Sequence, residues 1–421
     1  MKDVQTYAFR AAVAALIVWL ASPVCAQVPS EQPSTRASVL DDARQGLTSQ
    51  SVLPARSSIE RGLYWYDNQY LLAKLSVGWK GFHMAGGDFP AGAGIKFGVG
   101  YDRSLTGADA DPRLPNRIDL TARAAYSTRG YTRISTGVTA GNLGGARVDV
   151  DGFGQYYEFP QEDFFGLGRD SEKSDRTNYL LDAFETGGRM HWRPSVLDIG
   201  GGVSYLRPRI GHGTDDRFRS IEERFTPATI PGLGPQTNFL KAELSAAVDV
   251  RDNPMLPRNG GRYAVAVAQF DDRDLGRFDF RRTDVSLEQY VPLPQGWRVL
   301  ALRAEGVFTD ADRGNQVPFY FQPTLGGASA LRGFREFRFR DENSVLLGAE
   351  YRWQAWWALD GALFVDAGTV AQTRRALSLD KMEASYGVGF RVHSNSAFVA
   401  RLDLAFSREG FIPLLRFEHA F

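Results

Sequence analysis

The sequence has little cysteine, no excess of charge of either sign and, after its first residues, no long apolar run. Its 421 residues include one cysteine, and Lys+Arg and Asp+Glu balance at 49 each. A chain with equal numbers of basic and acidic residues shows no excess of positive charge for binding phosphate groups, so we expect it to bind no nucleic acid. No segment after residue 26 offers the roughly 20 consecutive apolar residues that a membrane helix needs. The sequence therefore predicts no helical membrane span after residue 26.

Residues suited to catalysis or metal binding are also scarce. Asp310 and Asp312 resemble the start of an acidic calcium loop, but the glutamate at EF-hand spacing is missing. No G-x-S-x-G nucleophile elbow occurs. We therefore expect no catalytic residue, no metal site and no cofactor, and we do not expect the chain to be an enzyme. Histidines without metal-ligand spacing stand at five positions: His83, His191, His212, His393 and His419.

The N-terminal residues form a targeting segment. Residues 11–21 are uninterruptedly apolar, follow two basic residues and precede a small-x-small cleavage site that ends at Ala26. This pattern predicts a secretory signal peptide over residues 1–26, which is too short to span a bilayer. Lipidation of Cys25 is a less favoured alternative, because the two preceding residues suit a lipoprotein box poorly. Residues 27–66 are polar and aperiodic, and are predicted to form a flexible periplasmic segment.

Alternation of apolar and polar residues runs through residues 67–421. Leu240, Leu244 and Val248 fall on one face of a strand, whereas Lys241 and Glu243 fall on the other. Because successive strand residues point to opposite sides, each strand has an apolar wall and a charged wall. Export combined with this pattern favours an all-β fold, a transmembrane antiparallel β-barrel with lipid outside and a polar lumen. The alternative is a soluble periplasmic β-protein, which would need a second sheet to cover the apolar faces.

We count sixteen strands, and the lengths of the links between them provide a check. The predicted strands start near Tyr70, Gly92, Arg117, Tyr131, Val148, Thr177, Val196, Asn238, Arg262, Arg277, Trp297, Ser344, Trp357, Met382, Ala397 and Gly410. Links at 193–194, 292–294, 354–355 and 395–396 are short, as periplasmic turns should be, whereas two links, about 210–236 and 310–343, are long. The count is least secure near residues 102–130, and fourteen strands is the alternative.

A single arginine in the second long link points to an internal ion pair. Arg332 is followed by Gly333 and Phe334, and alternation in the next two strands directs Glu350 and Asp366 into the lumen. A guanidinium fork on a loop that folds inward can bond two carboxylates from fixed directions, whereas a lysine offers only a point charge. We therefore predict a loop lock made of these five residues.

The C-terminal strand ends on an aromatic residue. Leu415, Phe417 and Phe421 share one face of this strand. Two interpretations are compatible: a lipid-facing strand, and a signal that the machinery assembling outer-membrane barrels recognises. Such an assembly signal is a property of that machinery's clients, so it carries no information about the activity of this chain.

These motifs are similar to those of the BamA/TamA family of the bacterial surface antigen superfamily. The resemblance extends over about residues 70–421 and rests on Leu331-Arg332-Gly333-Phe334, Glu350-Tyr351-Arg352, Phe364-Val365-Asp366-Ala367-Gly368, Phe164–Gly168, Asp252–Gly260 and the final Phe421. It implies a sixteen-stranded barrel whose loop Arg332 binds Asp366 and Glu350 in the lumen. It also implies insertion or translocation of proteins at the outer membrane, with a lateral seam between the first and last strands.

The resemblance also implies partners, and in one respect the sequence departs from the family. We expect contact with outer-membrane lipid, unfolded outer-membrane or secreted protein clients, and a separate periplasmic partner protein. The roughly forty residues between Gln27 and the first strand are too few for a POTRA module, which receives clients by strand addition. The alternative function is therefore a passive channel or a structural surface antigen that retains the fold without insertase activity.

Overall fold

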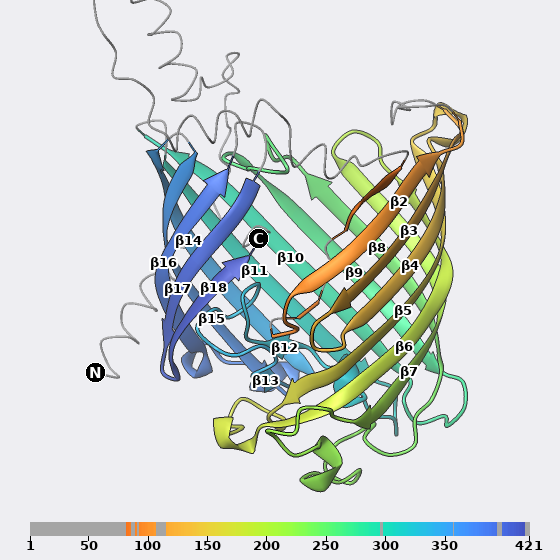
Figure 1. The fold of residues 1–421 in the computed structure, drawn as a ribbon, viewed down its shortest axis with the longest axis vertical. Helices are drawn as coiled ribbons and strands as arrows, with labels where there is room; N and C mark the ends of the chain where they lie inside the picture. The colour runs from red at the N-terminus through yellow and green to blue at the C-terminus, as the bar shows by residue number, and fades with distance from the viewer. Residues whose placement is uncertain are drawn as a thin grey trace, which may run out of the picture. The chain divides into compact units, whose positions relative to one another are not determined.

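The fold is given by a computed structural model (Figure 1) that describes residues 81–85, 89–90, 92–106, 115–294, 298–356, 358–393 and 398–416. Residues 56–377 and 382–421 form one compact unit, and residues 1–55 and 378–381 are assigned to another. The predicted signal peptide, residues 1–26, and the N-terminal segment, residues 27–66, lie outside the described residues, as do Phe417 and Phe421.

The larger unit consists of a single antiparallel sheet of sixteen strands, each paired with its neighbour in the sheet. The fold class predicted from the sequence, an all-β barrel of sixteen strands, is thereby confirmed. Its strands are β1 (Phe82–Met84), β2 (Lys96–Ser104), β3 (Arg117–Ser127), β4 (Thr132–Gly141), β5 (Val148–Phe164), β6 (Thr177–Trp192), β7 (Leu197–His212), β8 (Phe239–Asp249), β9 (Gly260–Asp272), β10 (Phe280–Leu293), β11 (Arg298–Ala311), β14 (Asn343–Trp356), β15 (Leu359–Ala371), β16 (Glu383–His393), β17 (Phe398–Ser407) and β18 (Gly410–Arg416).

A two-stranded hairpin lies in the long link between β11 and β14. It pairs β12 (Thr324–Leu325) with β13 (Phe339–Arg340), so the intervening residues 326–338 form a loop of their own. Short 3₁₀ turns are η1 (Leu143–Gly145), η2 (Lys173–Asp175), η3 (Ile221–Glu223), η4 (Phe319–Phe321), η5 (Arg374–Ala376) and η6 (Leu379–Lys381). Across the described ranges, no helix is long and apolar enough to cross a membrane.

The link lengths follow the pattern expected for a barrel, with two exceptions near the start. The β7–β8 and β11–β14 links are long and both join an odd-numbered strand of the sheet to the next even one. The β3–β4 turn on the same side is short, whereas the β2–β3 link on the opposite side is long, as the sequence indicated. The predicted turn at 354–355 is wrong: a bulge between Gln354 and Trp356 extends β14 to Trp356. The predicted first strand at Tyr70 lies outside the described residues.

The strands β5, β6 and β7 are the longest in the sheet. β5 has 17 residues and β6 and β7 have 16 each, whereas a strand needs about 9–11 residues to cross a bilayer. The last β4–β5 pair is Thr132 with Glu158, so β5 continues alone with β6 toward the long-loop end. This flank therefore projects past its neighbours on the side of the long loops.

The two walls of the sheet differ as the alternation predicts. Leu244 is 73% exposed, Tyr386 54% and Leu363 50%, although all three are apolar or aromatic. On the other wall, Ser385 beside Tyr386 and Asp366 on the strand of Leu363 are both 0% exposed although they are polar. A polar interior with an apolar exterior is the reverse of a water-soluble protein and is typical of an outer-membrane barrel.

The edges of the sheet are β1 and β18. Among the described residues, β1 pairs only with β2, and β18 pairs only with β17. Figure 1 shows β2, in orange, and β18, in blue, on the same side of the curved sheet. No pairing joins β1 to β18 among the described residues, so these two strands are the ends of the described sheet.

Candidate functional site in the lumen

Residues 326–338 form a loop that folds into the lumen. Glycines allow its sharp backbone turns, and its apolar side chains pack against the barrel wall. Gly326 and Gly327 have φ values of 122° and 87°, which place the chain in the left-handed region where glycine is favoured. A side chain at Gly326 would lie 2.0 Å from the carbonyl oxygen of Arg335. The apolar side chains of the loop form a cluster with the barrel wall, whose members are Leu325, Leu331, Phe334, Phe339, Leu346 and Val370.

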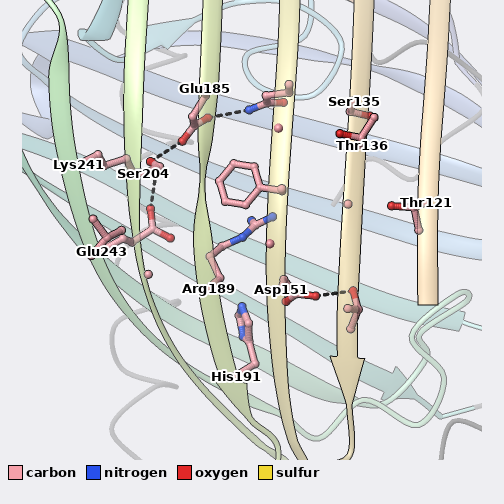
Figure 2. A pocket seen from close by; sticks show the side chains of 18 of the residues that line it. Thr121, Ser135, Thr136, Asp151, Glu185, Arg189, His191, Ser204, Lys241 and Glu243 are labelled. Carbon is pink, nitrogen blue, oxygen red and sulfur yellow. Dashed lines mark hydrogen bonds and ion pairs between the residues drawn. The ribbon is translucent and has the colours of Figure 1, made fainter. Parts of the chain in front are cut away.

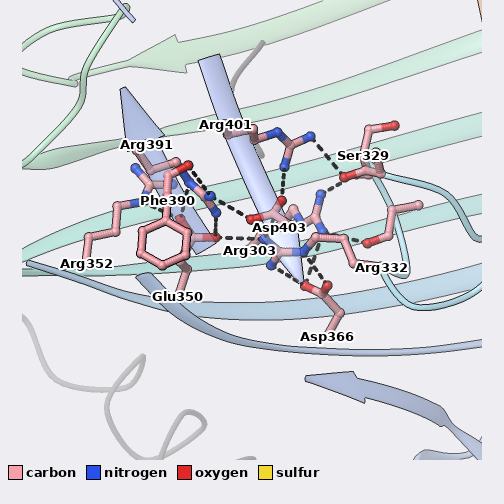
Figure 3. Close-up of polar contacts among 12 residues, drawn as sticks. Arg303, Ser329, Arg332, Glu350, Arg352, Asp366, Phe390, Arg391, Arg401 and Asp403 are labelled. Carbon is pink, nitrogen blue, oxygen red and sulfur yellow. Dashed lines mark hydrogen bonds and ion pairs between the residues drawn. The ribbon is translucent and has the colours of Figure 1, made fainter. Parts of the chain in front are cut away.

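Arg332 extends from this loop to two carboxylates on adjacent strands (Figure 3). Its Nε donates to Oδ2 of Asp366 at 2.7 Å and its Nη2 donates to Oδ1 of the same carboxylate at 2.9 Å. Its Nη1 donates to Oε2 of Glu350 at 2.8 Å. The guanidinium also lies 3.6 Å from the centre of the Phe364 ring. This is a forked, bidentate pair, the arrangement for which arginine is suited and lysine is not.

All three members of this lock are removed from solvent. Arg332, Glu350 and Asp366 are each 0% exposed. Burial would lower the pKa of the Arg332 guanidinium, but the Asp366 and Glu350 carboxylates outweigh it and hold that pKa above its ordinary value. The arginine therefore stays charged. Removing one partner from a buried pair of this kind costs about 3–5 kcal/mol, because the other charge is left uncompensated.

The lock belongs to a larger ionic network on the lumen wall. Glu350 also accepts from Arg352 at 2.8 Å and from Nη2 of Arg391 at 2.8 Å. Arg391 in turn donates to Asp403 at 2.6 Å, and Arg401 donates to Asp403 at 3.2 Å. The network joins β14, β16 and β17. The sequence interpretation did not assign Arg391, Arg401 or Asp403 to the lock, although the alternation of apolar and polar residues in their strands is a signal that could have found them.

Two further arginines bind the backbone of the loop. Nη1 of Arg303 on β11 donates to the Ser329 carbonyl at 2.6 Å, and its Nη2 donates to the Ala330 carbonyl at 3.0 Å. Nη2 of Arg401 donates to the Ala328 carbonyl at 3.0 Å. The network contains more guanidinium groups than carboxylates. The three carbonyl dipoles offset part of this excess positive charge. The loop is held by its main chain as well as by Arg332.

The loop also contacts the hairpin formed by β17 and β18. The Ser407 hydroxyl donates to the Gly333 carbonyl at 2.6 Å, and Arg338 Nε donates to Glu409 Oε1 at 2.6 Å. Arg416 on β18 lies 3.7 Å from Glu336. These contacts connect the loop to the strand at one edge of the seam. We refer to them below as the hairpin contacts.

The opposite wall of the lumen is open and polar (Figure 2). A cavity of about 590 Å³ lies along the inward faces of β3 to β8. Gln155 donates to Glu185 at 2.7 Å, and Ser204 donates to the same carboxylate at 2.8 Å. Arg189 lies 4.3 Å from the centre of the Phe153 ring. The lumen is therefore filled with loop on one side and lined by hydrophilic groups on the other.

The other residues singled out in the sequence have different surroundings. Leu415 is 63% exposed on β18, but Phe417 and Phe421 lie outside the described residues, so the proposed assembly signal is only partly described. His191 bonds Asp198 at 2.8 Å and His212 bonds Glu222 at 2.6 Å, each as a local pair. Within the described ranges, no group of three or more His, Cys, Asp or Glu residues could hold a metal ion.

Comparison with known proteins decides the family. Residues 120–410 match the model of the Omp85 superfamily domain. The chain belongs to the Omp85 superfamily. Membership confirms the BamA/TamA-type resemblance that the loop and strand motifs indicated. A search of curated protein sequences gave no match.

Three solved structures resemble this chain, and the one with a TM-score above 0.5 supports the fold. BamA from Haemophilus ducreyi lacking POTRA domains 1–3 matches with a TM-score of 0.56 at 14% identity, covering 80% of this chain and 69% of that one. CdiB from Acinetobacter baumannii gives 0.46 at 11% identity, covering 79% and 57%. CdiB from Escherichia coli gives 0.47 at 12%, covering 86% and 68%. The chain thus spans little more than half of the A. baumannii protein. At 14% identity, the match to BamA shows a likeness of fold alone.

Proposed function

We propose that this Omp85 chain resides in the bacterial outer membrane and assists the insertion or translocation of proteins there. Family membership and the structural match to BamA support a role with polypeptide clients. The apolar outer wall supports contact with outer-membrane lipid. Unfolded outer-membrane or secreted proteins are the proposed clients, and a periplasmic protein is the proposed partner that delivers them.

The observation that carries the proposal is the bidentate bond from Arg332 to Asp366, shared with Glu350. Buried charges hold this loop inside the lumen, where it fills one side. A barrel that handles polypeptide needs an occluded lumen at rest and a seam that can be opened. The lock supplies the first, and the hairpin contacts place the loop against the strand beside the seam.

The proposed mechanism uses an unpaired strand edge. An open edge presents free N–H and C=O groups that a nascent strand can pair with. In the described residues the two edges of the sheet belong to β18 and to β1 (Phe82–Met84). Arg332 keeps the loop in place, and the loop in turn orients the β17–β18 hairpin. Client strands would add at this edge.

Reconstitution tests the proposal. Purified chain in lipid vesicles receives a urea-denatured outer-membrane protein, and folding is followed by protease protection and by the shift in gel mobility of folded barrels. We expect faster folding than in empty vesicles, and a loss of that gain in Arg332→Ala. Arg374→Ala serves as a matched control, because this arginine lies in an exposed ion pair with Asp310. Equal folding rates of the client with and without the chain would contradict the proposal.

A passive channel is the second candidate, and the open polar wall along β3 to β8 favours it. The two candidates differ in planar-bilayer recordings. A steady open-pore current for small solutes, together with no effect on client folding, supports the channel. A closed, flickering trace supports the occluded barrel. A surface antigen that merely retains the fold would neither conduct a steady current nor speed the folding of a client.

A further inference from the structure

A second, smaller cavity lies between the loop and the projecting flank of the barrel. Its volume is about 370 Å³, within the range of small-molecule sites. One side is formed by Phe159, Glu162, Tyr179 and Leu181, which lie on β5 and β6 beyond the last β4–β5 pair. The other side is formed by residues of the long β11–β14 link, including Tyr320 and Phe337. The cavity is thus set apart from the Arg332 lock.

Four side chains that line this cavity carry polar atoms without a hydrogen-bond partner in the described part of the chain. They are Oε1 of Glu162, Nε of Arg340, Oε1 of Gln322 and the hydroxyl of Tyr320. Glu162, Arg340 and Gln322 are each less than 5% exposed. Buried polar atoms are nearly always paired in native proteins, so four unpaired ones around a single cavity need an explanation. A bound polar molecule provides one.

The remaining lining is rich in aromatic rings. Tyr157, Phe159, Tyr179, Tyr320 and Phe337 all border the cavity. Phe337 has a φ of 58°, which is unusual for a bulky residue. Strained residues concentrate at sites where surrounding structure or a ligand holds them. The cavity therefore combines flat apolar faces with a few convergent polar groups, as small-molecule sites do.

The charges narrow the class of ligand. A cation would suit Glu162 and the rings, but Arg340 and Arg133 line the same cavity and would repel it. An anion would suit the two arginines, but it has no proton to donate to the unpaired oxygen of Gln322. A neutral molecule with several hydroxyl groups can accept from Arg340 and donate to Glu162 and Gln322. Its ring C–H faces can pack against the aromatic side chains.

We propose that this cavity binds a neutral saccharide unit at the outer end of the barrel. The sugar is either free or borne by a membrane lipid, since both present the same hydroxyl-bearing ring. The proposal holds whether the chain inserts proteins or acts as a channel, because none of the four unpaired atoms belongs to the Arg332 lock. Two substitutions that nearly keep the shape of the side chain test it: Glu162→Gln replaces an oxygen by an NH2 donor, and Tyr320→Phe removes the hydroxyl.

The experiment uses the full chain in detergent micelles and in lipid nanodiscs. Binding of glucose and N-acetylglucosamine oligomers is measured by calorimetry and ligand-observed NMR, with inorganic phosphate and free arginine as comparison probes. Nanodiscs with and without lipopolysaccharide form the second arm, which separates a lipid-borne sugar from a free one. We expect saccharide binding that weakens about tenfold in Glu162→Gln, because an oxygen that can accept from the sugar is replaced by an NH2 group and a buried hydroxyl of the sugar is left unpaired. Tyr320→Phe should weaken it by a smaller factor.

Controls make each outcome decisive. Glu243→Gln changes a luminal carboxylate that lines only the larger cavity, so it should leave saccharide binding unchanged. Gel-mobility shift on heating verifies that each variant is folded. A cavity that holds water only, with no saccharide bound in either arm, overturns the proposal. So does preferential binding of phosphate or arginine, or saccharide binding that is the same in wild type, Glu162→Gln and Tyr320→Phe.

Discussion

Arg338 and Glu409, 71 residues apart in the chain, form an ion pair in which Nε donates to Oε1 at 2.6 Å. The same guanidinium donates from Nη1 to the hydroxyl of Ser171 at 2.9 Å and from Nη2 to its carbonyl at 2.7 Å. One arginine of the luminal loop thus connects the β5–β6 link to the β17–β18 turn. Because Arg338 is only 1% exposed, its contacts are protected from competition by water. We regard it as the second fixed point of the loop, after Arg332.

This pair should couple the loop to the β17–β18 hairpin. We expect Arg338→Ala and Glu409→Gln each to destabilise the barrel, with a coupling energy of roughly 1–3 kcal/mol in a double-mutant cycle. Hydrogen exchange in the β17–β18 turn should become faster in both variants. Arg408→Ala is the matched control, because Arg408 stands in the same turn and pairs at an exposed position with Glu383. Strict additivity of the two substitutions would show that the pair carries no coupling.

The Arg332 lock should contribute strongly to stability. In Arg332→Ala, two buried carboxylates lose a shared partner, so we expect a loss of about 3–5 kcal/mol in the free energy of unfolding. Arg332→Lys should recover only part of this, because a lysine cannot bond Asp366 through two parallel donors. Urea titration followed by gel mobility measures both. If lysine restored full stability, the fork geometry would be irrelevant.

Gly333 should tolerate no side chain. It has a φ of 92°, and an added Cβ would lie 3.1 Å from both the Phe406 carbonyl oxygen and the Cβ of Ser385. Gly314 has a similar φ of 87° but open space around it. We expect Gly314→Ala to show only backbone strain, on the order of 1 kcal/mol, and Gly333→Ala to lose more. Equal losses of stability in the two variants would mean that the close approach to β16 and β17 is unimportant.

Phe334 should act through packing rather than charge. It is 1% exposed in the apolar cluster between the loop and the strands β14 and β15. Phe334→Ala leaves a cavity and should cost about 3–5 kcal/mol, whereas Phe334→Leu should cost less. Planar-bilayer recordings should show longer open events in the alanine variant, because the loop is less firmly held. An unchanged trace together with the stability loss would separate packing of the loop from closure of the lumen.

Much of the fold can be predicted from the sequence because each barrel strand has a residue pattern that identifies it. Apolar residues must face outward and polar ones inward, so a two-residue period marks each strand independently of the others. The predicted starts at Arg117, Val148, Thr177 and Gly410 coincide with those in the structure. The turn between β14 and β15 was misplaced because a bulge at Gln354–Trp356 breaks this period locally.

The lock was accessible to sequence reasoning for a different reason. Glu350 and Asp366 lie on neighbouring strands, so their inward direction follows from local alternation alone, and Arg332 is conspicuous within a motif. The contacts of Arg338 and Arg303 were not accessible. They depend on the path of a loop between distant segments, and no periodic pattern encodes that path. The cavity at Glu162 is of the same kind, because β5 forms only half of it.

The unequal heights of the barrel wall affect how large molecules reach the luminal loop. With 17 residues in β5, roughly 6–8 residues, or about 20–26 Å of strand, extend beyond the part that a bilayer covers. An antibody, a phage fibre or a protease that approaches from that flank contacts the projecting ends of β5, β6 and β7 before it reaches Arg332 or its neighbours. The link that follows β5 also reaches the β17–β18 turn, where Nζ of Lys173 donates to the Glu409 carbonyl at 3.2 Å. Large molecules that approach over this turn therefore meet the same link between β5 and β6.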